Sequence, residues 1–339
     1  MLQRFCEPFQ YAAVLNRSAK EPNPYIRLAL CAAFSIGSIA INIYRTLKFF
    51  NPLLSETYEN IDNDLNFRYF AEQVSHHPSI TACYGEGDGY TYYANSLSDY
   101  KFQLMKGCLV FTSLGKTYYT FENFNEVITI VKPKTVVRNL IVGTLHLDTN
   151  GKMLVNNQTT GDVLELEIQE ESKNECGKFA GEAKDIYGNI HLKLEGNIHS
   201  HMDIMYQDTL GKEIRETIWR KIKIEGNEEE RFYFTDFVCN LNNLNDELKK
   251  VLPPSDSRFR SDQRALENQD IDLATSEKHR LEEKQRALRK ENEKLKVKHN
   301  PLYFEETYDD MSGELIYRYK GNYFDDRKAK RFDKFLDIF

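Results

Sequence analysis

A long succession of short strand-like segments runs from about residue 58 to residue 237. Stretches such as Gly85–Gly89 and Asn150–Gly151 separate the segments as turns would. The pattern is plainest in Val163–Ile168, where apolar and acidic residues alternate with a period of two. Many sequential strands joined by tight turns favour an antiparallel meander or barrel.

Other segments in this region also have the composition of strands. We predict strands at Tyr90–Tyr93, Gly107–Thr112, Lys116–Phe121, Val127–Val131, Val136–Leu147 and Val163–Ile168. The 20 Tyr and 21 Phe residues suit sheets with half-buried faces. A hydrophobic content of 41% is typical of a globular protein.

Helices are expected on both sides of these strands. Residues 1–47 favour two helices, one within Met1–Leu15 and an apolar one that begins near Pro24. The uncharged stretch Leu28–Tyr44 is at the short limit for crossing a bilayer and contains polar residues, so we predict a buried core helix and no transmembrane span.

The chain after residue 240 becomes helical and densely charged. We predict a short helix over Leu241–Leu252, stopped by Pro253, and a long unbroken helix over Asp262–Lys298. A short strand pair is expected within Leu302–Tyr323, before a mixed-charge tail. Because no repeat or low-complexity linker interrupts the chain, we expect one domain over residues 1–339.

Composition also limits the partners and the compartment. A formal net charge of -7 argues against a general nucleic-acid binder, so any site for an anion must be local. The six cysteines are widely spaced and no signal peptide precedes them, which indicates a reducing compartment and favours the cytosol.

Two adjacent histidines, His76 and His77, are the most unusual local feature. Once protonated, they can donate to an anion, and their ordinary pKa lies near 6.5. Pro78 favours an extended His77, which would turn the rings to different sides unless the chain curls tightly. Taken alone, such a pair is more often a hydrogen-bonded surface feature, and no nearby Cys or His completes a metal site.

Three stretches in order resemble one family. Glu72–Pro78, which reads EQVSHHP, is similar to the signature of the oxysterol-binding-protein-related lipid transfer family. Lys48–Glu56 upstream and Leu252–Arg264 downstream, the latter followed by Glu277–Arg286, are similar to other motifs of that family. Three matches in the right order across most of the chain make a chance resemblance improbable.

The resemblance implies a fold and a function. The fold is mainly β: a large, incompletely closed antiparallel barrel with a lipid tunnel, N-terminal helices (1–47), barrel strands (58–237) and a C-terminal helical segment and tail (241–339). The implied function is that of a cytosolic, peripheral protein that carries phosphatidylinositol 4-phosphate and exchanges it, at transient contacts with membrane surfaces, for a second lipid, a sterol in the first instance. No cofactor is implied.

The resemblance also implies a set of residues that bind the phosphorylated head group. Lys278, Glu282 and Arg286 follow one another at intervals of four residues. On one helix they lie within about 80° of one another and can face one pocket. Glu282, being anionic, is expected to accept from inositol hydroxyls or to orient its cationic neighbours. The full set is Lys48, Asn51, His76, His77, Lys278, Glu282 and Arg286.

The chain departs from the family pattern in three places. Ser79 stands where the family commonly has a second proline, and Ser55 stands where it commonly has glycine. The chain also begins at Met1 with the part that follows the family's lid segment, so either the lid is lost or the sequence is truncated. None of the expected head-group residues is replaced.

Two rival functions remain open at this stage. A phosphoinositide-modifying enzyme could use His76 or His77 as acid or base, but no nucleophile or magnesium-type carboxylate cluster is evident in the sequence. A sensor or tether could read the phosphoinositide without moving lipid. Lipid exchange between two vesicle populations would separate a carrier from a sensor. Of these alternatives, we expect a carrier that is not an enzyme.

Overall fold

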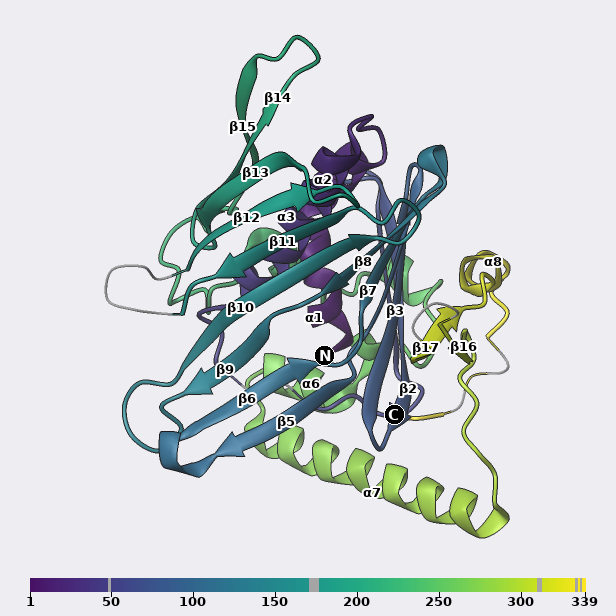
Figure 1. Ribbon diagram of the computed structural model, residues 1–339. Coiled ribbons are helices and arrows are strands. Elements are labelled where there is room, and N and C mark those ends of the chain that lie inside the picture. The colour runs from purple at the N-terminus through teal and green to yellow at the C-terminus, as the bar shows by residue number, and fades with distance from the viewer. Residues whose placement is uncertain (48–49, 171–176, 310–312, 333–334, 336) are drawn as a thin grey trace.

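The computed structural model describes residues 1–47, 50–170, 177–309, 313–332, 335 and 337–339. Within this part of the chain, 15 strands form one antiparallel sheet that curls around the N-terminal helices (Figure 1). The strands are β1 Thr57–Asp62, β2 Phe67–His76, β3 Ser79–Gly87, β4 Tyr90–Asn95, β5 Ser98–Gln103, β6 Cys108–Ser113, β7 Thr117–Phe121, β8 Glu126–Val131, β9 Lys134–Arg138, β10 His146–Asn157, β11 Val163–Ile168, β12 Lys178–Lys184, β13 Ile190–Asn197, β14 His201–Gln207 and β15 Glu213–Arg220.

The strand order follows the chain closely. Twelve strands form the path β1-β2-β3-β4-β7-β8-β10-β11-β12-β13-β14-β15, while β5, β6 and β9 form a branch that joins β10 through β9. No pairing between β1 and β15 occurs in the described sheet, so the barrel is not closed. The predicted mainly-β, incompletely closed antiparallel barrel is confirmed.

Alternation along β11 shows why this sheet has a dry inner face. Leu164, Leu166 and Ile168 are at most 1% exposed, whereas Glu165 and Glu167 face solvent. This is the period of two that the sequence shows at the same residues. The inner face packs on the N-terminal helices: α1 Leu2–Cys6, a 3₁₀ turn Glu7–Tyr11, α2 Ala12–Ser18 and α3 Pro24–Asn42.

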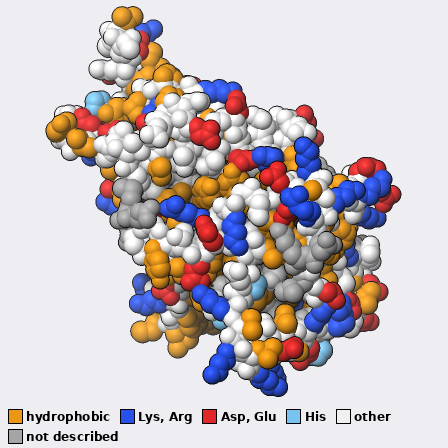
Figure 2. Space-filling view, turned by 90° about the vertical axis from the view of Figure 1, so that its right-hand side faces the viewer, with side chains coloured by type: hydrophobic (Ala, Val, Ile, Leu, Met, Phe, Trp, Pro, Cys, Tyr) orange, Lys and Arg blue, Asp and Glu red, His pale blue; other side chains and the backbone are white. Residues whose placement is uncertain are grey.

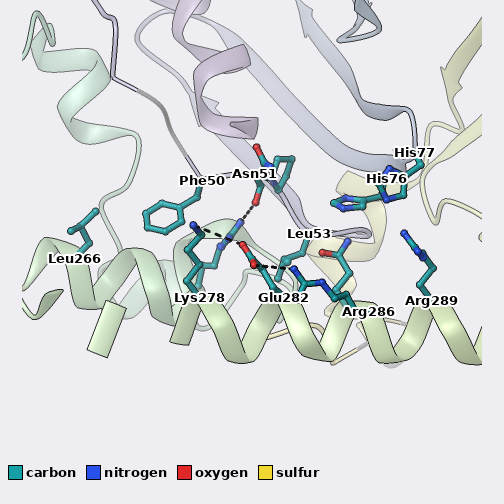
Figure 3. A pocket seen from close by; sticks show the side chains of 13 residues that line it. Phe50, Asn51, Leu53, His76, His77, Leu266, Lys278, Glu282, Arg286 and Arg289 are labelled. Carbon is teal, nitrogen blue, oxygen red and sulfur yellow. Dashed lines mark hydrogen bonds and ion pairs between the residues drawn. The ribbon is translucent and has the colours of Figure 1, made fainter. Parts of the chain in front are cut away.

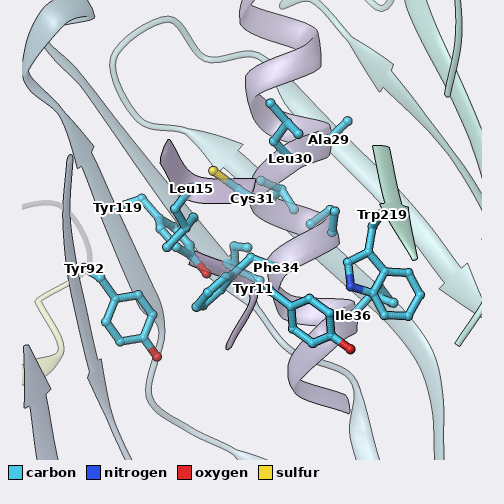
Figure 4. Close-up of a cluster of buried hydrophobic side chains, with 14 of the residues drawn as sticks. Tyr11, Leu15, Ala29, Leu30, Cys31, Phe34, Ile36, Tyr92, Tyr119 and Trp219 are labelled. Carbon is cyan, nitrogen blue, oxygen red and sulfur yellow. The ribbon is translucent and has the colours of Figure 1, made fainter. Parts of the chain in front are cut away.

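α3 is the central helix of this core. The Asn23 side chain caps it by accepting from the backbone N–H groups of Tyr25 and Ile26, and Pro24 occupies its first turn. The helix is long and apolar enough to cross a membrane, but 72% of that stretch is buried inside the protein. Phe34 packs edge-on against Tyr119 of β7, with the ring centroids 6.2 Å apart (Figure 4). The structure therefore places α3 as a core helix.

Three predicted elements were wrong in extent. Val136–Leu147 is not one strand, because the chain turns back between β9 and β10 and leaves Leu140–Val142 exposed. Asn139 adopts a φ of 62° there, and its side chain donates to the Thr144 carbonyl. The apolar run is therefore a loop, although its composition is that of a strand.

The C-terminal helices are shorter than predicted. Leu241–Leu252 is not one helix; α4 Asp236–Asn240 and α5 Asp246–Lys249 each begin after their own side-chain cap, Thr235 and Asn245. Asp262–Lys298 is interrupted as well, and forms α6 Ser261–Glu267 and α7 Ile271–Leu295. Gln269 adopts a φ of 62° between them, and Asp270 caps α7.

The remaining elements lie against the outer face of the sheet. The predicted strand pair is confirmed as β16 Phe304–Tyr308 and β17 Leu315–Tyr319, followed by α8 Tyr323–Ala329. A second buried cluster joins them to β2 and β3, with Phe70 and Tyr323 stacked at a centroid distance of 3.8 Å. The Glu72 carboxylate accepts from the backbone N–H groups of Leu302 and Tyr303. The outer face of β2 therefore holds the C-terminal segment in place.

Candidate functional site

A cavity of about 600 Å³ lies between α7, the β2–β3 turn and the segment that precedes β1 (Figure 3). We call it the basic pocket, because four of its lining side chains are those of Lys or Arg. Its lining residues are Phe50, Asn51, Pro52, Leu53, His76, His77, Arg260, Leu266, Lys278, Glu282, Gln285, Arg286 and Arg289.

The basic pocket contains every expected head-group residue that the structure describes. Asn51 comes from the segment before β1, the two histidines from the β2–β3 turn, and the remaining three from α7. Lys48 lies outside the described residues. Segments far apart in the sequence thus deliver their polar side chains to one cavity. Figure 2 shows cationic and anionic side chains mixed over the face it presents. The formal net charge of the chain is -7, so the excess of cations in the pocket is a local property.

One face of α7 forms the floor of the pocket. Glu282 lies between two cations, 3.9 Å from the Lys278 Nζ and 3.5 Å from an Arg286 nitrogen. All three side chains are about half exposed, so these ion pairs are weak and exchange readily with water or with an anion. Glu282 therefore holds the two cations side by side on the floor of the pocket, and Arg286 also pairs with Glu283.

The two histidines stand above this floor at the end of β2. Their ring centroids are 4.7 Å apart with the planes at 75°, so the chain does curl tightly enough to bring both rings together. The His76 Nδ1 atom is buried and has no hydrogen-bond partner within the described residues. Burial, then the neighbouring His77 and Arg289, lowers the pKa of His76, which favours the neutral imidazole.

The turn that carries the histidines is held by a polar network. The Gln73 amide nitrogen donates to the Ser79 hydroxyl at 3.0 Å, and the Thr81 hydroxyl donates to the Gln73 amide oxygen at 2.5 Å. The β2–β3 pairing shifts register between Gln73 and Ser75. A bulge at this point re-aims the strand end, so the histidines reach the pocket.

Arg260 fixes the segment that carries Asn51. Its guanidinium is 3% exposed and bonds to the Glu56 carboxylate at 2.7 Å and the Asp262 carboxylate at 2.9 Å. The same guanidinium donates to the Asn51 carbonyl at 2.8 Å. Its donors are therefore largely occupied by the protein, and Arg260 positions the pocket wall.

The family model for oxysterol-binding protein matches residues 1–328. This chain belongs to the oxysterol-binding protein family. It is 31% identical to oxysterol-binding protein-related protein 3B of Arabidopsis thaliana, over 97% of this chain and 72% of the relative. It is also 31% identical to oxysterol-binding protein-related protein 3 of Homo sapiens, over 98% of this chain but 37% of the relative. The chain therefore spans about a third to three quarters of these relatives.

Two solved structures share the fold over the whole chain. The Osh1 ORD domain in complex with cholesterol superposes with a TM-score of 0.90 at 29% identity, covering 100% of this chain and 84% of that one. The Osh3 ORD in complex with PI(4)P, from Saccharomyces cerevisiae, gives a TM-score of 0.83 at 27% identity, covering 100% of this chain and 88% of that one.

Two of the three departures from the oxysterol-binding protein pattern, Ser55 and Ser79, can be located in the structure. Ser55 keeps the left-handed conformation that a glycine would favour, with a φ of 69°. Its backbone N–H donates to the Gln73 carbonyl, and the Gln73 N–H donates to the Glu56 carbonyl. Ser79 supplies the hydroxyl that holds Gln73. Ser79 therefore stabilises a wall of the basic pocket through its side chain, whereas the hydrogen bond at Ser55 is made by its backbone.

Sequence reasoning missed three polar residues that line the pocket, Arg260, Gln285 and Arg289. Arg289 lies one helical turn beyond Arg286 and forms an ion pair with Glu293 at 3.2 Å. The Gln285 side-chain nitrogen is buried and has no hydrogen-bond partner within the described residues. Extending the predicted helix face by one turn would have found Arg289, whereas no sequence pattern distinguishes Gln285.

Proposed function

We propose that this chain binds phosphatidylinositol 4-phosphate through the basic pocket and exchanges it for a second lipid, a sterol in the first instance, between membranes. The observation that carries the proposal is the convergence of the two histidines, Asn51 and the cationic face of α7 on one cavity. The structural neighbours crystallised with cholesterol and with PI(4)P support the same pair of ligands.

The chemistry of the pocket suits a phosphorylated inositol. A phosphate that leaves water needs several donors or cations around its charges, because an unpaired buried charge is very costly. We assign this role to Lys278, Arg286, His76 and His77, together with Lys48. Glu282 and Asn51 are the acceptors and donors for the ring hydroxyls.

Exchange follows if both lipids occupy the same protein in turn. A carrier that binds one lipid at a time releases it when the other enters, so a concentration gradient of the phosphoinositide drives movement of the second lipid. Binding requires no covalent step, so we propose a carrier and not an enzyme. We place this carrier in the cytoplasm, peripheral to organelle membranes. The five cysteines within the described residues form no disulfide, which supports this compartment.

The test is transfer of labelled phosphatidylinositol 4-phosphate and labelled sterol between two liposome populations. We compare the wild type with the His76→Ala/His77→Ala double variant. The matched control is His191→Ala/His201→Ala, which removes two histidines on β13 and β14 that do not line the basic pocket. The proposal expects loss of phosphoinositide transfer in the first variant alone.

Other outcomes select the rival functions. Binding of the phosphoinositide without transfer of either lipid would identify a sensor or tether. Recovery of altered head groups or acyl chains after incubation, read by mass spectrometry, would identify an enzyme. Equal loss of transfer in both double variants would contradict the assignment of the basic pocket.

A further inference from the structure

A second cavity, of about 210 Å³, lies between the C-terminal half of α3 and the inner faces of β6, β9 and β10. We call it the interior cavity. Four apolar side chains that line it, Ile39, Ile43, Phe111 and Leu147, are left only half buried by the protein itself. An apolar surface of this kind gains stability when a hydrocarbon chain or ring covers it.

Lys132 is the one charged side chain in the described lining of the interior cavity. It follows Ile128 and Ile130 of β8 at the next alternate position, and both isoleucines are fully buried in the core. Alternation along an extended chain therefore turns Lys132 to the same inner side. Within the described residues its ammonium makes no hydrogen bond and no ion pair.

The described part of the chain covers Lys132 only in part and supplies no partner for its ammonium. Burial lowers the pKa of the Lys132 ammonium, and the nearby Cys83 thiol opposes this only in part. The hydroxyls of Thr135 and Thr149, which also line the cavity, bond to each other at 2.9 Å and do not offset the charge. An anion that enters the interior cavity would offset the charge of the Lys132 ammonium directly.

We propose that the Lys132 ammonium binds an oxyanion at the polar end of the lipid in the interior cavity, and that it makes the cavity prefer an anionic phospholipid to a neutral sterol. The phosphate ester on the glycerol of an anionic glycerophospholipid is the group that fits. It pairs with the ammonium through charge-assisted hydrogen bonds, while the part of an acyl chain next to the glycerol covers the half-buried apolar residues, because a cavity of about 210 Å³ holds only part of the lipid. This inference rests on the proposed function as a lipid carrier.

The experiment measures extraction of lipid from phosphatidylcholine liposomes that contain phosphatidic acid, phosphatidylinositol 4-phosphate or cholesterol. Phosphatidic acid has a phosphate close to its acyl chains but no inositol, so it reports on Lys132 without the basic pocket. The variant is Lys132→Met. The matched control is Lys134→Met, an exposed lysine of β9 that does not line the interior cavity.

Lys132→Met is expected to lower extraction of both anionic phospholipids about tenfold and to leave cholesterol extraction unchanged or raised. Lys134→Met should change none of the three. Lys132→Arg, which keeps the charge, should retain most of the extraction and provides the test if the methionine variant does not fold. Unchanged extraction of anionic lipid by Lys132→Met, or an equal loss for cholesterol, would overturn the proposal.

The same experiment separates this inference from the proposed function. A wild type that extracts phosphatidic acid but not phosphatidylinositol 4-phosphate would contradict the head-group assignment and leave Lys132 supported, provided that Lys132→Met loses the phosphatidic acid. A wild type that extracts cholesterol alone would overturn the role of Lys132.

Discussion

Among single residues, His76 is the one that we expect to couple ligand binding in the basic pocket to pH. Its pKa is lowered, first by burial and then by His77 and Arg289. A phosphate beside the ring favours the protonated form and raises the pKa again. Binding of phosphate is therefore accompanied by uptake of a proton whenever the pH lies between the lowered and the raised value.

We predict that affinity for a water-soluble, short-chain phosphatidylinositol 4-phosphate rises several-fold as the pH falls from about 7.5 to about 6. His76→Gln should flatten this dependence, because glutamine can donate but does not titrate. Calorimetric titration at several pH values, in two buffers of different ionisation enthalpy, measures both affinity and proton uptake. Identical slopes for wild type and variant would exclude His76 as the titrating group.

The free energy of unfolding, measured without a phosphate ligand, should depend on pH in the opposite direction. A histidine whose pKa is lower in the folded state than in the unfolded state contributes stability that is present above the unfolded pKa, near 6.5, and is lost as the pH falls. Acid therefore lowers the stability of the free protein over the range in which it strengthens binding.

At the scale of elements, the break between α6 and α7 determines where the floor of the basic pocket begins. The Asp270 N–H donates to the Ala265 carbonyl at 3.0 Å, which closes the end of α6, and Gln269 takes the left-handed conformation there. This conformation costs a residue with a side chain about 1 kcal/mol, and costs glycine almost nothing.

We predict that Gln269→Gly raises the free energy of unfolding by about 1 kcal/mol and the melting temperature by about 1–3 °C. The Gln269 side chain is exposed, so its removal sacrifices no packing. The control is Asn268→Gly at the neighbouring position, where φ is -80° and glycine brings no relief. Denaturant titration measures both variants, and equal effects would contradict this explanation of the helix break.

The same elements show what the sequence could and could not predict. Strands such as Val163–Ile168 were predictable because one face is wet, which leaves an alternating pattern. The break at Gln269 and the loop at Leu140–Val142 were not, because neither contains a proline and their residues suit a helix and a strand respectively. The head-group residues could be predicted from the resemblance of their motifs to the family. The role of Lys132 could be inferred only from the cavity that the structure shows around it.

Two neighbouring loops form an exposed apolar tip at one end of the protein. Met105 lies in the β5–β6 connection, and Ile141 and Val142 lie in the β9–β10 connection. Met105 is fully exposed and Val142 is 81% exposed. The Leu140 N–H donates to the Gly107 carbonyl at 3.0 Å, which ties the two loops together. Exposed lysines at positions 101 and 106 flank the tip, an arrangement that suits an anionic bilayer surface.

The strands that carry this tip, β6, β9 and β10, also line the interior cavity, so contact of the tip with a bilayer would bring the cavity close to its lipids. We predict that Met105→Asp/Ile141→Asp lowers co-sedimentation with anionic liposomes and lipid transfer several-fold, because two carboxylates oppose insertion into the bilayer. Binding of short-chain phosphatidylinositol 4-phosphate in the basic pocket should remain unchanged.

The control for this prediction is Leu210→Asp/Tyr187→Asp. Both side chains are at least as exposed as Val142, at 91% and 84%, but Leu210 lies in the β14–β15 turn at the opposite end of the molecule (Figure 1). If exposed apolar area alone governed contact with the membrane, both double variants would lose transfer equally. Loss confined to Met105→Asp/Ile141→Asp would mean that the protein approaches the bilayer with the end that carries the apolar tip. The strands of that end, β6, β9 and β10, also line the interior cavity.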